Sequence, residues 1–210
     1  VKSEKVILIR QVADKVVEVK SPGLDGLIVN FSIGSIHENS PADIQKAFVD
    51  SILKNCISDV KEAAKTVLGK LFLEVSQRGH GNLSVTIEHK KNKLPKLLKT
   101  DGVILNPPLD IVSAIRQLQS DGSILSLNEL INKLALIQGM LNSDGVTVFG
   151  NNGTVLAYRV FIKHPSDKKG EKVEGGARSR TFKVLSDHVG KEIESCFMQS
   201  QDGKMKIKVK

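Results

Sequence analysis

Residues 144–162 read Asp-Gly-Val-Thr-Val-Phe-Gly-Asn-Asn-Gly-Thr-Val-Leu-Ala-Tyr-Arg-Val-Phe-Ile. Two runs rich in β-branched and aromatic residues flank the Gly150-Asn-Asn-Gly153 segment, and such runs favour strands. Asn and Gly tolerate the positive φ that a tight turn requires. The stretch therefore predicts a β-hairpin whose first strand begins directly after Asp144-Gly145.

A helical pattern precedes this hairpin. Apolar residues recur at spacings of three and four over residues 127–140, with Ser126 or Asn128 as the expected N-cap. Further helices are expected over residues 111–118, over 178–189, and over 41–76 as a hairpin or one kinked helix that starts at Ser40-Pro41. The hairpin is thus expected to lie among several helices.

Shorter apolar runs predict the other strands. Residues 83–88 alternate apolar and polar side chains after an Arg78-Gly-His-Gly turn, as a strand should. Pro107-Pro108 is expected to end a short strand that begins at Gly102. Residues 5–20 predict an opening strand or short helix followed by a strand, and residues 27–33 predict another strand. Residues 193–198 and 205–209 predict a second hairpin around the turn Asp202-Gly203. These elements predict an α/β (α+β) fold class, with a central mixed β-sheet flanked by helices.

Composition places the chain among ordinary globular proteins. Its 210 residues are 40% hydrophobic and 26% charged, and no run approaches the roughly 18 apolar residues of a membrane span. The first residues lack the apolar stretch of a signal peptide. Cys56 and Cys196 lie in apolar patterns, so two buried thiols in a reducing compartment are expected rather than a disulfide. We therefore expect a cytoplasmic protein.

The formal net charge of +8 favours polyanionic partners. The basic residues gather in two clusters, Lys90, Lys91, Lys93, Lys96 and Lys99, and Lys204, Lys206, Lys208 and Lys210. Aromatic residues make up only 4%, so a stacking surface for single-stranded nucleic acid is not expected. Solvated faces explain both clusters, and we expect weak binding of nucleic acid or none.

The segment Gly175-Gly-Ala-Arg-Ser-Arg-Thr181 lies where a polar loop meets a helix. Glycine lets the backbone approach an anion, and the first helical turn offers free N–H groups with a favourable dipole. Arg178 and Arg180 add charged donors, and Ser179 and Thr181 add hydroxyls. The pattern predicts a phosphate site; the alternative is a flexible loop with two surface arginines.

The order of these motifs resembles the diadenylate cyclase domain. That family carries Asp-Gly-Ala where this chain has Asp144-Gly-Val, and Gly-Thr-Arg-His-Arg where it has Gly176-Ala-Arg-Ser-Arg. The resemblance covers residues 78–210, which are expected to form the nucleotide-binding core. Residues 1–77 are expected to be a strand and helical lead-in, and the whole chain one compact unit.

The resemblance implies condensation of two ATP molecules into cyclic di-AMP, with a divalent metal (manganese or magnesium). Two domains would meet face to face, so a homo-oligomer is expected. Asp144 would engage the metal and the attacking hydroxyl. The nucleotide and its phosphates would contact Gly145, Val146, Gly176, Arg178, Ser179, Arg180, Thr181 and Ser200.

The chain also departs from the family pattern. Val146 replaces alanine, Ala177 replaces threonine, and Ser179 replaces the histidine between the two arginines. A serine of the last strand pair normally faces the phosphates, and Gln199 and Ser200 compete for that place. These departures leave an alternative, which is a catalytically inactive domain of the same fold that senses a nucleotide or second messenger.

Overall fold

The computed structural model describes residues 7–13, 16–21, 24–30, 40–77, 80–88, 94–98, 101–162 and 176–210. Several features of the sequence lie outside these ranges. They are the Arg78-Gly79 part of the glycine turn, Lys90, Lys91, Lys93 and Lys99 of the first basic cluster, and the loop over residues 163–175.

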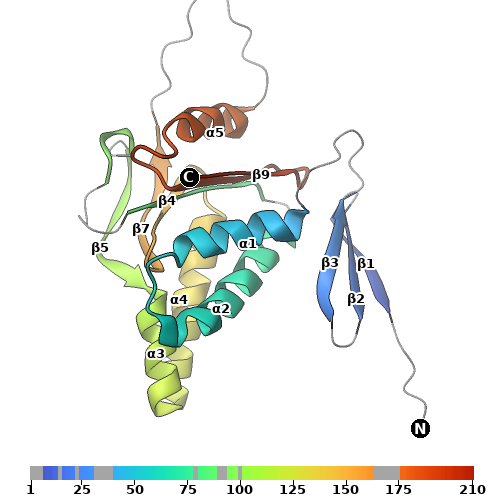
Figure 1. Cartoon of the computed structure of the whole chain (residues 1–210), viewed down its shortest axis with the longest axis vertical. Coiled ribbons are helices and arrows are strands. Elements are labelled where there is room, and N and C mark those ends of the chain that lie inside the picture. Colours follow the sequence, from blue (N-terminus) through green and yellow to red (C-terminus); the bar gives the residue numbers. More distant parts are fainter. Residues whose placement is uncertain are drawn as a thin grey trace, which may run out of the picture.

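The first strands form a small antiparallel sheet of their own. Its order is β1 (Leu8–Ala13), β2 (Val16–Ser21) and β3 (Leu24–Asn30), and β3 contacts the helix that follows. Figure 1 shows this sheet beside the main body of the molecule. The sequence indicated strands here but not a second sheet.

The large sheet has six strands in the order β5-β7-β6-β4-β8-β9. Their bounds are β4 (Asn82–Ile87), β5 (Asp101–Asp110), β6 (Val146–Gly150), β7 (Thr154–Phe161), β8 (Ser195–Gln199) and β9 (Met205–Val209). β4 and β6 are parallel and every other pair is antiparallel. The predicted mixed sheet is therefore confirmed, as are the hairpins β6–β7 and β8–β9.

Helices cover both faces of this sheet (Figure 1). One face carries α1 (Pro41–Ile52), α2 (Ser58–Gln77), α3 (Ile111–Asp121) and α4 (Ile124–Leu141), and the other carries α5 (Ala177–Asp187). Neighbouring residues of β6 show the two layers, because Phe149 packs into the core of α1–α4 and Val148 into that of α5. Because both faces are covered, β4, β6 and β8 are buried along their whole length, including the polar residues Ser84 and Thr86 of the alternating strand β4.

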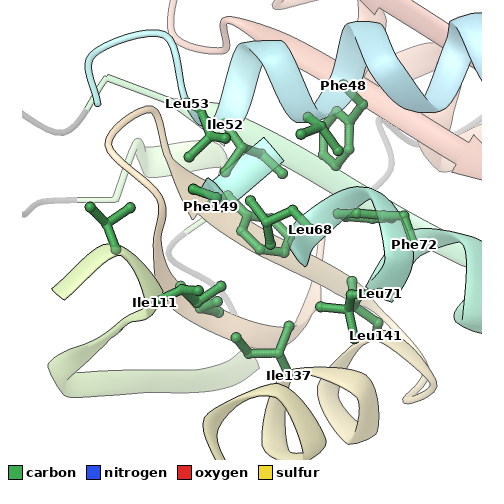
Figure 2. Packing of buried hydrophobic residues seen from close by; sticks show 14 of the residues in the cluster. Phe48, Ile52, Leu53, Leu68, Leu71, Phe72, Ile111, Ile137, Leu141 and Phe149 are labelled. Carbon is green, nitrogen blue, oxygen red and sulfur yellow. The ribbon is translucent and has the colours of Figure 1, made fainter. Parts of the chain in front are cut away.

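Four phenylalanine rings join the first two helices to the sheet. The Phe48 ring stacks on the Phe197 ring at a centroid distance of 5.1 Å and meets the Phe72 ring edge-on at 5.4 Å. Phe149 completes the group, and Figure 2 shows aliphatic side chains such as Leu68 around it. Residues 41–77 therefore share one hydrophobic core with the sheet that residues 82–209 build.

The prediction that Pro107-Pro108 ends a strand was wrong. β5 continues through both prolines to Asp110, with a shift in its pairing to β7 between Ile104 and Leu109. β5 is an edge strand, and an edge tolerates residues that cannot donate a backbone hydrogen bond.

The predicted cap of α4 was also wrong, because the helix begins one turn earlier. Ser123 is the N-cap, and its Oγ accepts from the Ser126 backbone N–H at 3.1 Å. Ile124 and Leu125 are 76% and 81% exposed, so apolar periodicity could not mark this first turn.

Both cysteines are free thiols, as predicted. Cys196 is buried, but Cys56 is only half-buried, since it lies in the turn between α1 and α2. Burial raises the pKa of both thiols. Among the described residues, no helix has the length and apolar character that a membrane span needs.

Candidate functional site

A cleft of about 990 Å³ lies where β6 begins, β7 ends and α5 begins. It is lined by Leu83, Asp144, Gly145, Val146, Arg159, Val160, Phe161, Ile162, Gly176, Ala177, Arg178, Ser179, Thr181, Ser200, Gln201 and Asp202. All of the predicted site residues line it except Arg180. Segments distant in sequence are thus brought to one surface.

Asp144 and Gly145 form the turn that leads from α4 into β6. The Asp144 side chain is 80% exposed and faces the cleft. Gly145 has a φ of 93°, and a Cβ there would lie 2.8 Å from the carbonyl carbon of Arg159. Only glycine fits this position without moving the backbone of β7. The carboxylate is therefore presented to the cleft by a turn that depends on the following glycine.

The first turn of α5 forms the opposite wall. Gly176 is the N-cap and, as a glycine, has no side chain with which to cap the helix. The backbone N–H groups of a first helical turn lack intrahelical partners, so this end favours an anion. Ser179 in this turn and Thr181 directly after it line the cleft, whereas the exposed Arg180 does not.

Arg178 bridges the two walls. Its Nη2 donates to Asp144 Oδ1 at 3.2 Å, and its side chain is 30% exposed. The guanidinium also lies against Gly81, just before β4, because a Cβ at Gly81 would lie 2.6 Å from Arg178 Nη1 and 2.9 Å from the Gln199 carbonyl oxygen. Gly81 therefore leaves the space in which Arg178 is held.

We expect Gly81→Ala to weaken nucleotide binding about threefold and to lower the free energy of unfolding by about 1 kcal/mol, because the new methyl group displaces Arg178 and presses on the backbone of β8. Calorimetric titration and urea unfolding measure the two effects. Gly139→Ala is the matched control, since a Cβ in that exposed part of α4 meets nothing within 4 Å. The control should gain about 0.5–1 kcal/mol and bind as the wild type does. Unchanged binding by Gly81→Ala would show that Gly81 does not position Arg178.

The structure also distinguishes Gln199 from Ser200. The buried Gln199 side chain turns away from the cleft, and its Nε2 donates to the Ser76 carbonyl at 3.0 Å. Ser200 lines the cleft, and its hydroxyl donates to the Lys204 carbonyl at 3.1 Å. A hydrogen bond with Ser200 is the main cause that lowers the pKa of Asp202. The place beside the predicted phosphate site therefore belongs to Ser200.

Sequence reasoning missed several residues of the cleft. Leu83, Val160, Phe161 and Ile162 form an apolar wall with Val146, and they looked like ordinary strand residues in the sequence. Asp202 precedes a glycine between two strands, a pattern that predicts a turn and not a site residue. Nothing in the sequence marked Arg159 as a site residue, because a single arginine within a predicted strand usually has a solvated side chain.

Two carboxylates, those of Asp144 and Asp202, line the cleft. The described part of the chain contains no group of three or more His, Cys, Asp or Glu side chains that could hold a metal ion alone. Magnesium, however, is usually held by one or two carboxylates together with substrate phosphates. Asp144 therefore fits a divalent ion whose other ligands come from a bound phosphate chain.

Comparisons of the chain with family models, with curated proteins and with solved structures found no match. The resemblance to the diadenylate cyclase domain therefore stays a prediction from the motifs.

Proposed function

We propose that the cleft binds the phosphates of ATP or a related adenine nucleotide, and that the chain is a diadenylate-cyclase-like domain that condenses two ATP molecules into cyclic di-AMP. This proposal depends on one observation: Asp144, Arg178 and Ser200 line the same cleft at the N-terminus of α5, and Asp144 and Arg178 form an ion pair there. These residues come from three separate segments, and each is suited to a phosphate or to its counter-ion.

The two walls of the cleft suit the two parts of a nucleotide. The α5 wall offers a cation, two hydroxyls and the free N–H groups of a helix start. The β7 wall offers apolar side chains, among them Phe161, which is 48% exposed. We assign the first wall to the phosphates and the second to the base and sugar.

Cyclisation joins the 3′-hydroxyl of each ATP to the α-phosphorus of the other, and each α-phosphorus loses pyrophosphate while each hydroxyl loses its proton. Such phosphoryl transfer needs alignment and charge neutralisation more than covalent help from the protein. Arg178 and the α5 N-terminus neutralise charge and align the phosphates in this scheme. A divalent ion held by Asp144 would supply further neutralisation.

One cleft holds one nucleotide in this scheme, so two copies of the chain must face each other. The exposure of Asp144 supports this arrangement, since its carboxylate is reachable from a second chain. Turnover should therefore rise with self-association of the protein.

The alternative function is a sensor of the same nucleotide class that does not turn it over. The Asp144–Arg178 ion pair favours this alternative, because it engages the carboxylate that catalysis needs. Ala177 and Ser179 in the first turn of α5 favour it too, since each lacks a group that the family uses.

Incubation of concentrated protein with ATP and manganese or magnesium, followed by mass spectrometry, tests the proposal. A cyclase yields cyclic di-AMP. A sensor yields no product, but a nucleotide raises its melting temperature by mass action. If ATP neither reacts nor shifts the melting temperature, the nucleotide-binding proposal is wrong.

A further inference from the structure

Arg159, near the end of β7, has an uncommon backbone conformation. Its φ is 54°, and among the described residues it is the one non-glycine residue with a positive φ. Such a conformation costs free energy in any residue with a Cβ, and it persists only where the surroundings enforce it.

A bulge in β7 enforces this conformation. Val146 and Val148 of β6 pair with Val160 and Ala157, so Tyr158 and Arg159 together oppose the single residue Thr147. A bulge of this kind redirects a side chain, and bulges are common beside functional sites.

Two glycines beside the bulge make room for it, Gly145 in the turn just before β6 and Gly102 in β5. A Cβ at Gly145 would lie 2.8 Å from the carbonyl carbon of Arg159, and a Cβ at Gly102 of β5 would lie 3.2 Å from its carbonyl oxygen. The bulge is thus built into β5, β6 and β7 together, and its conformation follows from all three.

The consequence of the bulge is a second arginine at the cleft. Arg159 is exposed and lines the cleft beside Gly145, and no carboxylate among the described residues pairs with it. Arg178, in contrast, already pairs with Asp144. Arg159 is therefore the cation at the cleft whose charge no described residue neutralises.

We propose that Arg159 is a ligand-binding residue that contacts the outer phosphate groups of a polyphosphate chain and makes the cleft prefer polyphosphates over monophosphates. This inference rests on the proposed function, since it assumes that the α5 wall holds the first phosphate. Arg178 pairs with Asp144, the Arg159 backbone lies against the adjacent Gly145, and both arginines line the cleft. In this proposal a chain of several phosphates reaches both arginines, whereas a single phosphate held at the α5 wall contacts Arg178 alone.

The test uses Arg159→Gly, because glycine removes the side chain and accepts the positive φ without cost. Calorimetry compares ATP, AMP and inorganic tripolyphosphate, and thermal unfolding gives Tm. We expect about fivefold weaker binding of ATP and tripolyphosphate, unchanged binding of AMP, and a Tm no lower than that of the wild type. Arg116→Ala, which removes an equal charge from α3, should bind all three as the wild type does.

Several results would overturn the inference. Unchanged affinity for ATP and tripolyphosphate, an equal loss for AMP, or a lowered Tm would each assign Arg159 another role. If the wild type binds ATP but Arg159→Gly changes nothing, only this inference fails. If the wild type binds tripolyphosphate with the expected loss in the variant but does not bind ATP, only the proposed function fails. If the wild type binds neither, both fail.

Discussion

Arg178→Ala should weaken nucleotide binding roughly 10- to 100-fold, because a charge-assisted hydrogen bond to a phosphate contributes about 1.5–3 kcal/mol. Arg178 is the arginine that links α5 to Asp144 across the cleft, so its loss also removes the cation nearest the helix start. Calorimetric titration with ATP measures the change, and circular dichroism checks the fold.

Arg180→Ala is the matched control for this result. Arg180 lies two residues further along α5, and its exposed side chain does not line the cleft. We expect its removal to change affinity less than about twofold, the scale of an exposed charge. Equal losses in both variants would indicate a general effect of charge, and no loss in either would contradict the phosphate assignment.

Asp144→Asn should lower the yield of cyclic di-AMP about 10²- to 10³-fold, since the change keeps the shape of the side chain and removes the charge that holds the divalent ion. Binding of ATP without metal should be unchanged or up to about fivefold tighter, because Arg178 no longer pairs with a carboxylate. Mass spectrometry measures the first effect and calorimetry the second.

The two measurements separate catalysis from binding. If the protein is a sensor, the wild type yields no product and only the metal-free affinity responds to Asp144→Asn. A large loss of metal-free affinity would contradict the cleft geometry, because Asp144 would then hold the nucleotide directly rather than compete for Arg178.

Periodic patterns predicted the fold class and most elements. The alternating and continuous apolar runs of residues 144–162 and 193–209 indicated two hairpins, and both lie in the central sheet. The turn residues Asn151 and Gly153 indicated where the first hairpin reverses, for a reason local to the chain. Local rules of this kind depend on neighbouring residues, so they can be read without knowledge of the fold.

Features that depend on distant segments could not be predicted in this way. The apolar wall of the cleft arises from the pairing of β4, β6 and β7, and the bulge at Arg159 from the pairing of β5, β6 and β7, so neither follows from a short window of sequence. The continuation of β5 through Pro107-Pro108 depends on its position at the sheet edge. The polar residues of the α5 wall could be predicted from the sequence, because glycine, arginine and serine at the start of a helix suit phosphates in any fold.

The stacked rings of Phe48 and Phe197 limit how far the chain can be shortened from its N-terminus. A fragment that starts at residue 78 keeps the cleft-lining residues but loses α1 and α2, which cover one face of the sheet. Phe149 and Phe197 would then be exposed to solvent, and an exposed apolar surface of this kind promotes aggregation. A soluble minimal unit for ligand studies should therefore begin before Ser40, so that the capped start of α1 is retained.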